Sequence, residues 1–103
     1  MYEIELTTGA KKDLKSKTCR PHLKRILQEI KVLKEEPLTG SALKGSLVGV
    51  RSLHFKIKGS GEWRTAYYLL SKEKVCLVLL IDTRENFYKK AVVRLKAIKK
   101  RLL

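Results

Sequence analysis

The chain has 103 residues, 44% of them hydrophobic, which predicts a single globular domain spanning residues 1–103. Its 24 Lys and Arg residues exceed its 10 Asp and Glu residues and give a formal net charge of +14. This charge favours an anionic partner: nucleic acid first, then a membrane surface, then an acidic protein. There is no apolar run of about 18 residues, and residues 1–10 lack a secretory-signal pattern, so we expect a cytoplasmic protein without a membrane partner.

The two cysteines, Cys19 and Cys76, are far apart in the sequence and lie in unlike surroundings. A metal site needs clustered Cys and His ligands, and this spacing provides no such cluster. We therefore expect two buried or half-buried thiols, with no metal and no small-molecule cofactor.

The first part of the chain predicts one strand and two helices. Residues 2–6 alternate between apolar and polar, which is typical of a half-buried strand. Thr8 is the expected cap of a short basic helix over residues 9–17. Apolar residues then recur every three or four positions between Pro21 and Glu35, which predicts an amphipathic helix. The two helices should form an antiparallel hairpin on one face of a sheet.

Residues 37–49 contain three glycines and are predicted to form a loop. Leu38, Leu43 and Leu47 are the residues expected to anchor this loop to the core. Lys44 and the glycine backbones could approach a phosphate, although the glycine spacing matches no nucleotide-binding loop.

The second part of the chain predicts three strands, over residues 50–58, 63–70 and 75–81, and then a helix. The helix is expected to begin near Arg84 or Glu85 and to end near Arg101. The last of the three strands is apolar on both faces and should be central or covered on both sides. The prediction is therefore an α+β fold of order β-α-α-β-β-β-α, with a small, mainly antiparallel sheet, a helical hairpin on one face and a C-terminal helix.

Charged residues share one face of the predicted sheet. In the strand over residues 50–58, alternation places His54, Lys56 and Lys58 on the face opposite the core residues. Arg64 lies in the middle of the next strand, where an unpaired buried guanidinium would be costly. It should either pair with an acid such as Glu85 or face an open groove. Arg84 lies near a helix N-terminus, which itself attracts anions.

Three stretches of the sequence are distinctive: Gly49-Val50-Arg51-Ser52-Leu53, Gly61-Glu62-Trp63-Arg64-Thr65-Ala66-Tyr67-Tyr68 and Thr83-Arg84-Glu85-Asn86-Phe87-Tyr88-Lys89-Lys90-Ala91. Together they resemble the RelE/ParE superfamily of toxins from bacterial toxin–antitoxin pairs. Toxins similar to RelE cut messenger RNA, usually on the ribosome, by attack of a ribose 2′-hydroxyl on the adjacent phosphorus. The resemblance also implies an antitoxin partner and no metal requirement.

The resemblance implies roles for individual residues. Arg64 and Arg84 would brace the scissile phosphate. Tyr88 would contact the reacting nucleotide or take part in proton transfer, or else it would pack on the sheet beside Phe87. Lys56, its pKa lowered by neighbouring cations, would act as acid or base, or form part of a solvated face.

His54 is a further acid–base candidate, because its unperturbed pKa lies near neutrality. Lys58, Arg51 and Lys44 are the expected RNA-binding cations. No clear carboxylate or histidine pair accompanies these residues, which suits an enzyme that depends on the ribosome to orient its substrate.

Two other functions fit the same residues. Members of the ParE branch inhibit DNA gyrase by binding and have no nuclease site. A non-catalytic basic nucleic-acid-binding module would also use the cationic face. The convergence of Arg64, Arg84 and Tyr88 favours the nuclease, since a gyrase inhibitor needs no such site.

Overall fold

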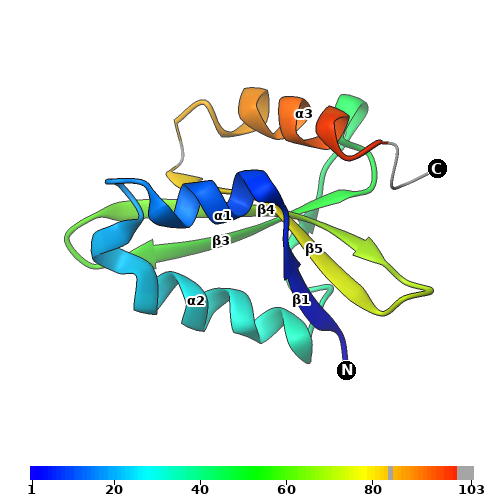
Figure 1. Ribbon diagram of the computed structural model, residues 1–103, viewed down its shortest axis with the longest axis horizontal. Helices are drawn as coiled ribbons and strands as arrows, with labels where there is room; N and C mark the ends of the chain where they lie inside the picture. Colours follow the sequence, from blue (N-terminus) through cyan, green and yellow to red (C-terminus); the bar gives the residue numbers. More distant parts are fainter. Residues whose placement is uncertain (84, 100–103) are drawn as a thin grey trace.

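The computed structural model describes residues 1–83 and 85–99 and contains a mixed five-stranded sheet. Its strands are β1 (Glu3–Leu6), β2 (Ser41–Ala42), β3 (Val50–Ile57), β4 (Gly61–Leu70) and β5 (Val75–Thr83). They lie in the order β1-β5-β4-β3-β2, with β1 parallel to β5 and the other neighbours antiparallel (Figure 1). The predicted α+β class and mainly antiparallel sheet are confirmed.

The described helices flank the sheet. They are α1 (Thr8–Lys15), α2 (Leu23–Lys31) and α3 (Phe87–Ala97), with short 3-10 helices η1 (Arg20–His22), η2 (Val32–Lys34) and η3 (Gly45–Leu47). The helix cap expected at Thr8 lies one residue earlier, at Thr7. Thr7 has an extended backbone at the end of β1, and its hydroxyl oxygen accepts the N–H of Ala10 at 3.1 Å. No helix among residues 1–83 and 85–99 is long and apolar enough to span a bilayer.

Two cores lie on opposite faces of the sheet. Residues of α1 and α2, among them Ala10, Ile26 and Ile30, pack with Trp63 and Tyr67 on one face. On the other face, α3 packs through a buried stripe of Phe87, Ala91 and Leu95. Figure 1 shows α2 and α3 on opposite sides of the strands. The predicted helical hairpin is therefore present, and β5 lies between the two layers, as expected for a strand that is apolar on both faces.

The edge of β5 is covered by side chains from both α1 and α3. Strand β1 pairs with β5 only as far as Val78. Beyond that point Asp13 of α1 accepts the N–H of Ile81 at 3.0 Å, and Arg94 of α3 donates to the carbonyl of Leu79 at 2.8 Å. Arg94 and Asp13 also form two hydrogen bonds with each other, at 2.7 and 2.9 Å. This ion pair joins the first and last helices across the sheet edge.

Residues 37–49 are not the plain loop that was predicted. Ser41 and Ala42 pair with β3, a strand too short for its alternation to be recognised, and residues 45–47 form η3. The Tyr67 hydroxyl accepts the N–H of Gly40 at 2.9 Å and donates to the carbonyl of Pro37 at 2.7 Å. Leu47 is buried as expected, but Leu38 is 67% exposed and does not anchor the segment.

Several predicted boundaries also differ. Strand β4 begins at Gly61 and β5 ends at Thr83, two residues beyond the expected limits. Helix α3 begins later than expected because Asn86, with φ of 58°, has a left-handed backbone. The expected start at Arg84 and end at Arg101 lie outside the described residues. Both Cys19 and Cys76 are free and buried, which confirms the expectation of two buried thiols.

Candidate functional site

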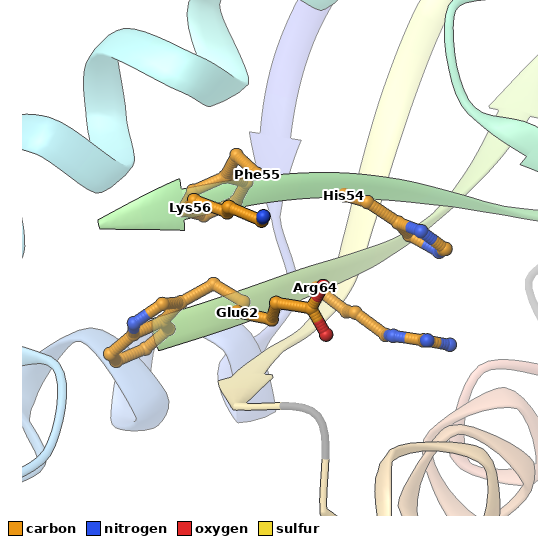
Figure 2. A pocket seen from close by; sticks show the side chains of 6 residues that line it. His54, Phe55, Lys56, Glu62 and Arg64 are labelled. Atoms are coloured by element: carbon orange, nitrogen blue, oxygen red, sulfur yellow. The ribbon is translucent and has the colours of Figure 1, made fainter. Parts of the chain in front are cut away.

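The site is a pocket on the sheet where β3 and β4 pair. His54 lies directly opposite Arg64, and Lys56 lies opposite Glu62. Residues opposite each other on antiparallel strands project from the same face. They border a hollow of about 200 Å³, the strand pocket, lined by His54, Phe55, Lys56, Glu62, Trp63 and Arg64 (Figure 2). Figure 2 shows His54 and Arg64 extending in the same direction from the two strands.

The strand pocket is open because α3 covers only part of this face. Val50 and Ala66, which share the face with His54 and Arg64, are buried in the core beneath α3. Towards the β3–β4 turn the helix no longer covers the sheet, and His54 and Lys56 are exposed. Polar side chains thus occupy the uncovered end of this face.

Arg64 contacts the first turn of α3. Its Nη1 donates a hydrogen bond to the Tyr88 hydroxyl at 2.5 Å. The guanidinium carbon lies 5.3 Å from the centre of the Tyr88 ring and 5.9 Å from that of Phe87, within the range of cation–π attraction. Two arrangements were open for Arg64, an ion pair with an acid such as Glu85 or a position facing an open groove. In the structure Arg64 borders the strand pocket and donates to Tyr88. The bond to Tyr88 occupies one of the five N–H donors of a guanidinium.

Tyr88 packs beside Phe87, one of the two placements expected for it, and also remains exposed next to Arg64. Its ring packs edge-to-face on Phe87, with centroids 5.4 Å apart, as expected of an aromatic on the sheet. The side chain is nevertheless 50% exposed, and its hydroxyl lies against Arg64. An exposed ring held beside a cation can stack on a nucleobase whose phosphate the cation binds.

The environment of His54 lowers its pKa below the ordinary 6.5. Partial desolvation at the sheet surface, where the side chain keeps contact with water, has the largest effect on the pKa; the positive charge of Arg64 adds to it, and the negative charge of Glu62 opposes it. The imidazole is therefore mostly neutral at pH 7 and can accept a proton. Among the groups of the strand pocket, His54 is suited to act as a base.

Glu62 is a pocket residue that the sequence analysis did not single out. It lies two residues before Arg64 on β4, on the same face. The strand predicted from the sequence begins at Trp63 and so leaves Glu62 outside it. Extending the alternation by one step from Arg64 would have found it.

The other predicted site residues are dispersed. Lys56 lines the strand pocket, whereas Lys58 is exposed in the turn after β3, and Lys44 is exposed just before η3. Arg51 lies on the opposite face of the sheet, where it donates to the carbonyls of Gly40 at 2.9 Å and Leu38 at 3.1 Å. It supports the segment before β3 and does not join the pocket. Arg84 lies outside the described residues.

In residues 1–83 and 85–99, no group of three His, Cys, Asp or Glu side chains is placed to hold a metal ion. The chemistry available at the strand pocket consists of cations, one neutral imidazole, one carboxylate and one phenol. Such a set can bind a phosphate and exchange protons with it.

Comparison with known families shows the class of protein to which this chain belongs. Residues 4–92 match the ParE-like toxins of type II bacterial toxin–antitoxin systems. The chain belongs to this family. No curated protein matches it in sequence.

Solved structures show the same architecture. The RelBE2 toxin–antitoxin complex of Mycobacterium tuberculosis contains a chain 27% identical, with a TM-score of 0.67, over 81% of this chain and 98% of that one. A mutant of the Escherichia coli toxin RelE in the free state is 26% identical, with a TM-score of 0.60, over 90% and 96% of the two chains. The intact E. coli RelBE complex is similar in fold, at 24% identity and a TM-score of 0.55, over 82% and 99%. The structural likeness places the chain near the RelE branch of the superfamily.

Proposed function

We propose that this toxin is a metal-independent endoribonuclease that cleaves messenger RNA on the ribosome. The observation that carries the proposal is the pairing of a neutral histidine with an arginine in one pocket, His54 beside Arg64. The likeness to RelE structures supports it. The functional unit would be the single domain of residues 1–103, acting in the cytoplasm where ribosomes are.

The proposed reaction is attack of a ribose 2′-hydroxyl on the adjacent phosphorus. It needs a base for the hydroxyl, cations for the charge of the phosphorane, and an acid for the departing 5′-oxygen. His54 would take the 2′ proton, and Arg64 with Arg84 would stabilise the phosphorane. Tyr88 would stack on the reacting nucleotide or donate a proton, since its oxygen accepts from Arg64 and leaves its O–H directed elsewhere. Lys56 would bind the phosphate or protonate the leaving oxygen.

A second candidate function is inhibition of DNA gyrase by binding, without cleavage. The family match to ParE-like toxins favours it. A basic nucleic-acid-binding module without catalysis would also use the strand pocket. Both alternatives predict intact messages in cells that express the protein.

Induced expression in bacteria should arrest growth through loss of translation. Primer extension on cellular messenger RNA is expected to show new 5′ ends within translated regions, because the ribosome would orient the substrate. The matched control is the Arg64→Ala variant, expressed at the same level. Intact messages accompanied by inhibited gyrase supercoiling would support the second function and refute the first.

Titration of His54 provides a test in the isolated protein. We expect its imidazole resonances, followed by NMR, to titrate with a pKa below 6.5, and Arg64→Ala to raise that pKa because the repelling charge is gone. If His54 is the base, cleavage should fall as pH drops through its folded-state pKa, where the imidazole gains its proton. A Lys72→Ala variant, which removes an exposed charge from the β4–β5 turn, should leave the His54 pKa unchanged. A His54 pKa above 6.5 would contradict the assignment.

An antitoxin partner is part of the proposal. The M. tuberculosis and E. coli relatives were solved as RelBE complexes with their antitoxins. The +14 charge of this chain suits an acidic segment that folds on its basic surface and neutralises the strand pocket.

A further inference from the structure

Asp82 lies next to the cation most important for the proposed chemistry. It is the cross-strand neighbour of Arg64 in the β4–β5 pairing, so the two side chains leave the same face of the sheet. Their Cβ atoms should be about 4.5–5.5 Å apart at such a position. A carboxylate at this distance is a strong partner for a guanidinium, because the two can form a bidentate ion pair. That pair would compete with a phosphate for Arg64.

The structure shows a different pairing. The Asp82 Oδ1 accepts the backbone N–H of Thr83 at 2.7 Å, and its Oδ2 accepts a hydrogen bond from the Lys90 ammonium of α3. The Asp82 side chain is 18% exposed, so its charge is poorly screened by water. Within the part of the chain that the structure describes, no ion pair joins Arg64 to Asp82, and Arg64 donates to Tyr88.

We propose that Lys90 is a positioning residue that holds the Asp82 carboxylate away from Arg64 and so keeps the guanidinium available for an RNA phosphate. The first turns of α3 would then contribute two separate contacts to the site. Tyr88 accepts a hydrogen bond from Arg64, and two residues later Lys90 binds the competing carboxylate. Lysine suits this task because its ammonium is a compact charge with three donors. The inference rests on the proposed function only in taking a nucleic-acid phosphate as the ligand of Arg64.

The test measures binding of a fluorescein-labelled, single-stranded 2′-deoxy oligonucleotide to the full chain by anisotropy. This probe carries the phosphates but has no 2′-hydroxyl, so the result does not depend on cleavage. Lys89→Ala is the matched control, since Lys89 is the exposed neighbour of Lys90 on the same helix. We expect Lys89→Ala to weaken binding by about threefold, through loss of one cation. Lys90→Ala should weaken it about tenfold or more, because Arg64 becomes paired with Asp82.

The decisive comparison repeats both substitutions in an Asp82→Asn background. There the competing charge is absent, and the penalty of Lys90→Ala should shrink to that of Lys89→Ala. If Lys90 touched the phosphate itself, its penalty would persist in the Asp82→Asn background, and the proposal would be wrong. If Lys90 only stabilised α3 through its ion pair with Asp82, Asp82→Asn alone would weaken binding as much as Lys90→Ala does, and the proposal would also be wrong. Lys90→Met, which keeps the aliphatic stem, should reproduce Lys90→Ala if the charge is what matters.

The outcomes separate this inference from the proposed function. Binding that depends on Lys90 only when Asp82 is charged, in a protein that leaves cellular messages intact, supports the role of Lys90 and refutes the nuclease. If messages are cleaved in cells but Lys89→Ala and Lys90→Ala weaken oligonucleotide binding equally, the nuclease is supported and the role of Lys90 is refuted. A wild-type chain that fails to bind the oligonucleotide at low salt overturns the role of Lys90.

Discussion

Replacing Arg64 with alanine is expected to reduce messenger RNA cleavage by about 10²–10³-fold, the usual cost of removing one donor that stabilises transition-state charge. Arg64 borders the strand pocket beside His54 and is held against Tyr88, and the proposed reaction assigns it to the scissile phosphate. The measurement is single-turnover cleavage of a message on programmed ribosomes with purified protein. Growth arrest on induction should be lost in parallel.

Two variants make this prediction specific. Arg64→Lys keeps the charge but loses the planar fork of donors, so its activity should lie between those of the wild type and Arg64→Ala. Lys72→Ala removes a charge from an exposed turn and should cleave nearly as well as the wild type. A folded Arg64→Ala protein with undiminished cleavage would refute the site. Arg84→Ala tests the role predicted from the resemblance for a residue outside the described ranges.

Replacing Arg94 with alanine is expected to lower the free energy of unfolding by roughly 2–4 kcal/mol, since it leaves a partly buried carboxylate without its cation. The side chains of Arg94 and Asp13 are only 25% and 15% exposed, and together they satisfy backbone groups at the β5 edge. Urea unfolding followed by circular dichroism would measure the loss.

The matched control for Arg94 is Arg25→Ala. Arg25 pairs with Glu29 on the surface of α2, where the side chains are 50% and 29% exposed, so its loss should cost less than about 1 kcal/mol. Gly9→Ala should act like Arg94→Ala, because a Cβ there would lie 2.6 Å from the Arg94 guanidinium and displace it. An Arg94→Ala protein as stable as Arg25→Ala would show that the ion pair does not hold α3 to α1.

Local patterns were sufficient to predict most of the fold. Alternation along residues 50–58 reports directly which side chains face the core, because successive residues of a strand point to opposite faces. It placed His54 and Lys56 on the face opposite the core, and both are exposed in the structure. Boundaries were less accurate, since a left-handed residue such as Asn86 and a two-residue strand such as β2 have no periodic signature.

The composition of the site depended on contacts between distant parts of the chain. Strand register placed Arg64 opposite His54 and beside Asp82, and register is set by pairing across the sheet. The docking of α3 brought Tyr88 to Arg64 from 24 residues away.

The sequence by itself determined a basic α+β domain with a cationic strand face, because charge and alternation are local properties. Only the tertiary structure decided which of those cations meet. It assigned Arg51 to the support of residues 38–40 on the opposite face, and it placed Lys90 on Asp82. The physical reason is that a side chain's partner depends on the packing of whole elements, which no short stretch of sequence specifies.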